Sequence, residues 1–204
     1  MPLINDSKLP DYFPQALIDS ARVIALQKNE RLFLNGDQVD GIYYILEGEL
    51  KAMRPMLKEG DVVMARARQG DYFAVSALTL EYFTCDGICV NSAEVLSLPK
   101  KEVINALKTP TFALGFSLAL ATNARRQCNR YERLRLQRSR DRLLHYLTCE
   151  SDQSGQFYWH SPLSELASEL AIEPETLYRT MANLEKEGAI ARDKRAFQLL
   201  RDEL

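Results

Sequence analysis

The stretch that decides the fold of the C-terminal part is Leu163-Ser-Glu-Leu-Ala-Ser-Glu-Leu-Ala-Ile-Glu-Pro174-Glu-Thr-Leu-Tyr-Arg-Thr-Met-Ala-Asn-Leu-Glu-Lys-Glu-Gly188. It predicts a short helix, a tight turn at 171–173 and a second helix that begins at Pro174 and ends before Gly188. The small Ala167 stands where two such helices would cross. The apolar residues expected to join them are Leu166, Leu170, Ile172, Leu177 and Met181 or Leu184. This is the spacing of a helix-turn-helix.

The first residues of the second helix would face outward, where a recognition helix meets base edges in the major groove. These candidate DNA-binding residues are Glu175, Thr176, Tyr178 and Arg179. Residues 189–192 and 196–200, joined by Asp193-Lys-Arg, predict a two-stranded wing. The alternative is a helical hairpin that only packs, and Ala171 stands at a turn position where glycine is common.

Charge is unevenly distributed along a chain of net charge −2. Residues 125–142 hold eight arginines against Glu132 and Asp141, whereas residues 143–204 are acidic. The arginines can face a polyanion or form the solvated face of a helix. We expect Arg140 and the wing residue Lys194 to contact phosphates, although an acidic segment weakens a DNA-binding interpretation because phosphate neutralisation supplies much of the affinity.

A long helix is predicted upstream, because no glycine or proline occurs between Gly115 and Gly155. It should begin at Thr109-Pro110 and run from about 111 to 137. Five residues within it have the a/d spacing of a coiled-coil seam: Leu120, Ala124, Gln127, Tyr131 and Leu134. The seam predicts pairing with a second copy, and the alternative is a core helix of its own domain. Ser139 is expected to cap a further helix, and Ser161 with Pro162 at the first helical position should start the next.

The N-terminal part, from about 23 to 98, has short segments of β-branched and aromatic residues between Gly and Asp turn signals, which indicates an antiparallel all-β unit. The whole chain is therefore expected to be α+β.

No apolar run approaches a membrane span and no signal peptide is present, so we expect a cytoplasmic protein. Four scattered cysteines do not form a disulfide framework. Two histidines without a neighbouring nucleophile, and no phosphate loop or metal signature, argue against an enzyme and against a cofactor.

These residues resemble the cyclic-AMP receptor protein/FNR (Crp/Fnr) family of transcription regulators over nearly the whole chain. The similarity lies in the glycine and aromatic spacing of residues 33–48, in Gly70-Asp71-Tyr72-Phe73, in Arg142 with Leu143, and in Glu175-Thr176 with Arg179. It implies a β-roll sensor domain at 1–110, a dimerisation helix at 111–138 and a winged helix-turn-helix at 139–204. It also implies a homodimer on a two-fold operator in double-stranded DNA, RNA polymerase as a partner, and no membrane.

Departures from the family pattern concern the effector pocket, which would comprise Tyr72, Phe73, Ala74, Val75, Phe83 and Thr84. Family members that bind cyclic nucleotides have Gly-Glu where this chain has Ala74-Val75, and Arg-Ser or Arg-Thr where it has Phe83-Thr84. There is also no arginine between Arg68 and Arg125. Because a buried phosphate needs a charge-assisted partner, we expect no cyclic-nucleotide binding.

The relatives' metal ligands have no clear counterpart here. No cysteine precedes Cys85, and His145 and His160 lie in or beside the DNA-binding part, so neither a cluster nor haem is expected. A redox signal sensed by Cys85, Cys89 or Cys128 is a further hypothesis. Pro174 replaces an arginine that many members use for guanine, so the operator should differ. The competing function is a ligand-binding or adaptor protein that keeps the architecture but binds DNA weakly.

Overall fold

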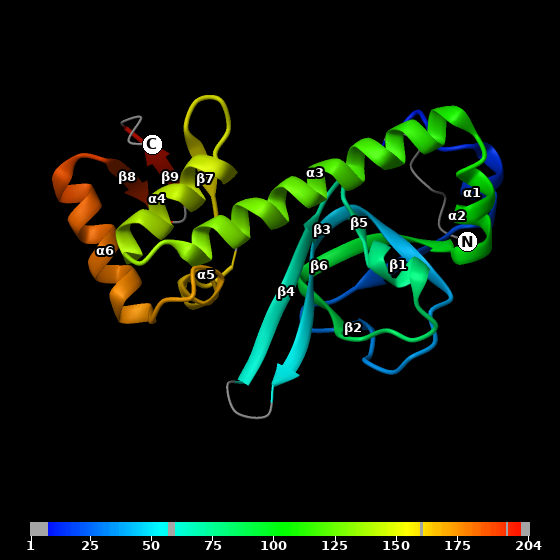
Figure 1. Ribbon diagram of the computed structural model, residues 1–204, viewed down its shortest axis with the longest axis horizontal. Helices are drawn as coiled ribbons and strands as arrows, with labels where there is room; N and C mark the ends of the chain where they lie inside the picture. Colours follow the sequence, from blue (N-terminus) through cyan, green and yellow to red (C-terminus); the bar gives the residue numbers. More distant parts are fainter. Residues whose placement is uncertain (1–7, 57–59, 160, 195, 201–204) are drawn as a thin grey trace. The chain divides into compact units, whose positions relative to one another are not determined.

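The computed structural model describes residues 8–56, 60–159, 161–194 and 196–200. The chain divides into two compact units after Ala121, a point that lies inside the long helix α3 (Pro110–Arg135). The predicted long helix is thus present, beginning at Pro110 and ending two residues earlier than expected (Figure 1).

The N-terminal unit is an antiparallel β-structure with short helices, as the sequence predicted (Figure 1). Its main sheet has the order β1-β6-β3-β4, with β2 paired to β6 and β5 paired to β3. The elements are α1 (Gln15–Ser20), β1 (Arg22–Leu26), β2 (Arg31–Phe33), β3 (Gly41–Met56), β4 (Gly60–Arg68), β5 (Tyr72–Phe73), the 3-10 helix η2 (Val75–Thr79), β6 (Asp86–Pro99) and α2 (Lys100–Ala106).

One glycine of the predicted β-roll signature has a clear structural reason. Gly48 has φ +86, and a Cβ there would collide with the carbonyl oxygen of Ser92 on the paired strand β6. An L-residue would therefore suffer both backbone strain and a clash with the sheet. This close approach lets β3 continue through a register shift against β6 without leaving the sheet.

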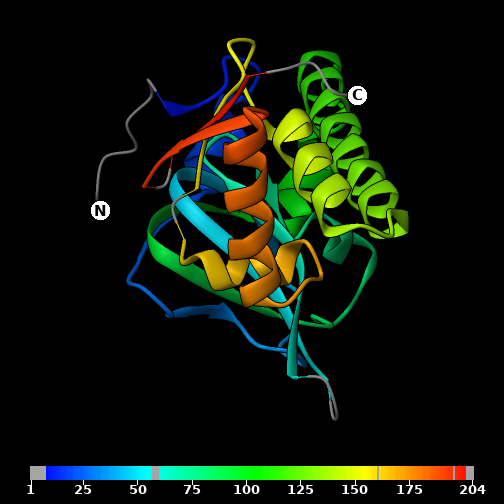
Figure 2. The ribbon, with the colours of Figure 1, turned by 90° about the vertical axis from the view of Figure 1, so that its left-hand side faces the viewer.

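The C-terminal unit contains a helix-turn-helix and a small sheet (Figure 2). Figure 2 looks onto α6, drawn in orange, with the shorter α5 near its N-terminal end. The sheet has the order β7-β9-β8. The elements after α3 are α4 (Ser139–Glu150), β7 (Gln156–Tyr158), α5 (Leu163–Glu169), α6 (Pro174–Glu187), β8 (Ile190–Asp193) and β9 (Ala196–Leu199).

Two local expectations for this unit, the caps of α4 and α5, were wrong, and one strand was missed. Ser139 is the first residue of α4 and not its cap, and its hydroxyl lies 2.9 Å from that of Thr180. Pro162 precedes α5 as the N-cap residue, and the buried Ser161 hydroxyl caps nothing. Strand β7 was not predicted, because three residues after a polar loop are too short for a periodic signal. It pairs with β9 and makes the expected two-stranded wing a three-stranded sheet.

Among the described residues, no single helix has the length and apolar composition of a membrane span, and only the pair of α2 and α3, bent by 111°, passes that test when combined.

Candidate nucleic-acid interface

The helix-turn-helix forms as its sequence signals predict. Leu166 and Ala167 of α5 are fully buried against Leu177 and Met181 of α6 in one core. Between the helices Ala171 adopts φ 52, the left-handed conformation for which glycine is usually chosen. At the other end of α6, Gly188 adopts φ 70 and terminates the helix. The two helices are therefore held at a fixed crossing by an apolar interface.

The outward face of α6 carries the predicted reading residues. Glu175, Tyr178 and Arg179 are exposed, and Thr176 is half-buried at the edge of the core. One turn beyond Arg179 lies Asn183, which is also exposed and which the sequence reasoning did not single out. An amide can bond adenine at two positions, so this side chain extends the candidate face. The sequence could have indicated Asn183, because it lies four residues after Arg179 and so shares its helix face.

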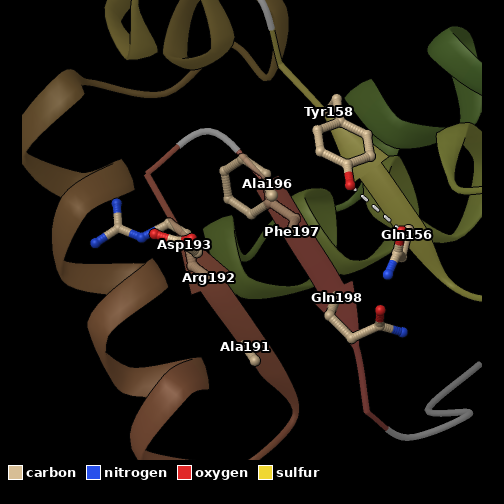
Figure 3. Close-up of a pocket in the computed structure, with 8 residues that line it drawn as sticks. All are labelled: Gln156, Tyr158, Ala191, Arg192, Asp193, Ala196, Phe197 and Gln198. Atoms are coloured by element: carbon tan, nitrogen blue, oxygen red, sulfur yellow. Dashed lines mark hydrogen bonds between the residues drawn. The ribbon is translucent and has the colours of Figure 1, made fainter.

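The wing contributes one predicted phosphate contact within the described residues. Lys194 is exposed and has φ 53 at the turn between β8 and β9. The outer side of this sheet holds a shallow hollow of about 210 Å³ (Figure 3). Its lining residues are Gln156, Tyr158, Ala191, Arg192, Asp193, Ala196, Phe197 and Gln198. Arg192 there lies 3.5 Å from Glu185, so its charge is matched from within the domain.

The arginine-rich segment is not one free basic surface. Arg133 is buried, with its guanidinium 3.1 Å from Glu169 and 4.7 Å from the ring centre of Tyr146. Arg140, a predicted phosphate contact, lies 3.3 Å from Glu187. Several of the eight arginines therefore neutralise acidic side chains of the same domain, which reduces the charge available to a polyanion.

Helix α3 exposes the apolar side chains that were predicted to form a dimer seam. Tyr131 is 62% exposed, Leu134 43% and Leu120 37%, and Ala124 and Gln127 are exposed between them. Large apolar side chains on a helix surface are usually covered by another element or chain. Two further exposed leucines lie earlier on the helix and were not predicted: Leu114 and Leu118.

Three of the residues expected to line the effector pocket, Tyr72, Phe73 and Phe83, are buried aromatic side chains. Phe83 is buried and stacks on Phe33 with 3.8 Å between ring centres, and Phe73 lies beside them. Tyr72 is buried in a neighbouring cluster. Ala74, with φ 62, precedes the 3-10 helix that begins at Val75. Phe83 and Phe73 thus belong to the core of the β-roll.

An arginine from a distant part of the chain lies beside Thr84. The sequence places no arginine near Thr84, yet Arg54 of β3 reaches it from 30 residues away. The Nε atom of Arg54 donates to the Thr84 carbonyl at 3.1 Å, and Nη2 donates to its hydroxyl at 3.3 Å. A guanidinium is therefore present at the exposed edge of the roll, although part of its donor capacity is used by Thr84.

The four cysteines differ in solvent exposure. Cys89 is fully buried and Cys85 half-buried, and burial raises the pKa of both thiols. Cys128 is exposed on α3. His145 lies 3.7 Å from the sulfur of Cys149 on the next turn of α4, and His160 lies outside the described residues. Within the described parts of the chain, no cluster of His, Cys, Asp and Glu has the arrangement of a metal site.

Comparison with known proteins identifies the architecture. Residues 23–109 match the cyclic nucleotide-binding domain family. No curated protein sequence matches. The chain is similar in structure to a CooA mutant from Carboxydothermus hydrogenoformans, with a TM-score of 0.78 and 14% identity, covering 97% of this chain and 91% of that one. It is similar to FixK2 from Bradyrhizobium japonicum with a TM-score of 0.73 and 15% identity, covering 89% of this chain and 93% of that one. It is also similar to a transcriptional regulator of the CRP family from Thermus thermophilus, TTHB099 (0.67, 23%, 87% and 92%). The resemblance to Crp/Fnr proteins is thus confirmed at the level of the fold.

Proposed function

We propose that this chain, which has the fold of the Crp/Fnr regulators, is a dimeric, sequence-specific DNA-binding protein that regulates transcription, with RNA polymerase as a further partner. The observation that carries the proposal is the helix-turn-helix itself. Its apolar side is fully buried, while Glu175, Tyr178 and Arg179 remain exposed on the outer side of α6. A helix held rigidly by one face and polar on the other is suited to enter a major groove.

A second function is favoured by one specific observation. The acidic C-terminal domain uses Arg133, Arg140 and Arg192 to pair with its own carboxylates. A protein of this architecture with weak affinity for phosphates would act as a ligand-binding or adaptor protein. The two functions differ in a property that is simple to measure, the dependence of DNA affinity on salt.

Titration of bulk double-stranded DNA at several salt concentrations tests the proposed function. We expect the logarithm of the binding constant to fall linearly with the logarithm of salt concentration, because each neutralised phosphate releases counterions. Binding that is undetectable at about 50 mM salt would favour the adaptor function, since electrostatic contacts are strongest at low salt.

Regulation by cyclic nucleotides is not part of the proposed function. Phe83 fills the core position where a phosphate-binding arginine would stand, and Arg54, the guanidinium at Thr84, already donates to that residue. We expect calorimetric titration with cyclic AMP and cyclic GMP to give no binding. A micromolar dissociation constant for either nucleotide would show that Arg54 or a rearranged Phe83 completes a phosphate site, and this part of the proposal would be abandoned.

A further inference from the structure

Arg142 connects two helix ends that are distant in sequence. Its side chain projects from the first turn of α4, and Nε donates to the carbonyl of Leu136 at 2.7 Å. Nη1 donates to the carbonyls of Ala171, at 2.7 Å, and Leu170, at 3.2 Å. Leu136 directly follows α3, whereas Leu170 and Ala171 lead from α5 into the turn before α6. One guanidinium therefore joins the end of α3 to the turn of the helix-turn-helix.

The chemistry of these acceptors explains why an arginine is suited to the position. The last carbonyl groups of a helix have no partner within the helix and carry the negative end of its dipole. A guanidinium offers several donors in a fixed plane and keeps its charge at any physiological pH. Arg142 can thus satisfy carbonyls from two helix ends at once, which a single ammonium group could do only with poorer geometry.

The same contact accounts for the unusual residue in the turn. A left-handed conformation is sterically unfavourable for a non-glycine residue, and Ala171 has φ 52. The turn is closed by the Ile172 amide, which donates to the Ala167 carbonyl at 3.0 Å, and Arg142 holds the Ala171 carbonyl from outside. The turn does without glycine because its strained residue is held in place by hydrogen bonds.

Two neighbouring contacts link the same elements but do not reach the turn. The nearly buried pair Arg133–Glu169 joins α3 to α5, and the hydroxyls of Ser139 and Thr180 join α4 to α6. Arg142, in contrast, bonds directly to Ala171, where the chain changes direction before Pro174. Arg142 therefore adds a polar restraint at the turn to the apolar interface that joins α5 and α6.

We propose that Arg142 is a positioning residue for DNA recognition, which fixes the α5–α6 turn and so presents the outer face of α6, and that it is not a phosphate contact. This inference rests on the proposed DNA-binding function. It assigns a structural task to an arginine whose place in a basic segment suggests a contact with the DNA backbone. Loss of a positioning residue should reduce affinity for the specific DNA sequence and leave the salt slope unchanged. Loss of a phosphate contact should reduce affinity for all sequences and lower the salt slope.

The test compares wild type with Arg142→Ala and Arg142→Lys on the duplex that wild type selects from a random pool and on an unrelated duplex of equal length. We expect Arg142→Ala to lose about tenfold or more in specific affinity, with non-specific affinity and the salt slope unchanged. Arg142→Lys should recover only part of the loss, because an ammonium lacks the planar fork. An equal loss on both duplexes, with the slope lower by about one, would identify a phosphate contact and overturn the proposal.

A second substitution separates positioning from a general loss of stability. Glycine adopts positive φ without steric cost, so Ala171→Gly should restore part of the specific affinity in the Arg142→Ala background. Binding is measured at a temperature where unfolding curves show each variant to be fully folded. Absence of rescue under these conditions would mean that Arg142 does not act through the turn.

Hydrogen exchange supplies a readout that needs no DNA. In Arg142→Ala the amides of 170–172 should exchange about tenfold faster or more, because the turn opens locally more often, while those of strand β9 keep their rates. Unchanged exchange at 170–172 would overturn the positioning role whatever the DNA result. A wild type that binds no DNA would instead refute the proposed function, and the exchange data would show separately whether Arg142 holds the turn.

Discussion

Replacing Tyr131 and Leu134 with glutamate is expected to convert the protein into a monomer and to reduce its affinity for a two-fold operator by about 10²- to 10⁴-fold. Both side chains are well exposed on α3, at 62% and 43%, and have the spacing of a coiled-coil seam. Like charges facing each other across a seam repel, so paired helices should separate. A monomer then loses the gain in affinity that comes from linking two binding modules.

Sedimentation velocity at micromolar concentration measures the first effect, and titration of the operator measures the second. The matched control is Leu34→Glu with Ile104→Glu, which places two charges at exposed apolar positions outside α3. These positions are 40% and 46% exposed, so the control should remain a dimer. A wild-type protein that sediments as a monomer, or a control that dissociates equally, would contradict the assignment of the seam.

Arg179→Ala is expected to relax the preference for one base pair, repeated symmetrically in both half-sites, without abolishing binding. Arg179 is exposed one turn into α6, on the same face as Glu175. Its guanidinium can donate to the N7 and O6 atoms of guanine, a contact worth about 1–3 kcal/mol in discrimination. Glu175 can brace the guanidinium or accept from cytosine N4.

Selection of binding sites from random duplexes measures this change. Arg140→Ala and Lys194→Ala serve as controls, because loss of a phosphate contact should weaken all sequences about equally and lower the salt slope by about one. The existing pair of Arg140 with Glu187 reduces the expected effect at that position. If Arg179→Ala selects the same operator as wild type, the assignment of α6 as the recognition helix, or of its reading face, is wrong.

The parts of the fold that sequence predicted well are those with strong local signals. Proline at the start and glycine after the end gave the bounds of α6, and its apolar spacing gave the face that packs on α5. The long α3 followed from the absence of glycine and proline over many residues. Such signals depend on a few neighbouring residues, so they do not require knowledge of contacts with distant parts of the chain.

The parts that sequence missed depend on partners far away along the chain. Glu169 forms an ion pair with Arg133, 36 residues away in sequence, and Arg54 donates a hydrogen bond to Thr84, 30 residues away. No local sequence pattern predicts either pairing. For the same reason the sequence offered the eight arginines only as a patch facing a polyanion or as a solvated helix face, although the fold pairs several of them with carboxylates of the same domain. Strand β7 is defined by its hydrogen bonds to β9 and not by periodicity.

Selection of wild-type binding sites from random duplex DNA tests the central claim most directly, because it requires specificity and dimerisation together. The account predicts an inverted repeat whose half-sites lie about one helical turn, ~34 Å, apart, as two copies of α6 related by a dimer axis would require. Recovery of a single asymmetric site would contradict the dimer, and recovery of no preferred sequence would contradict recognition by α6.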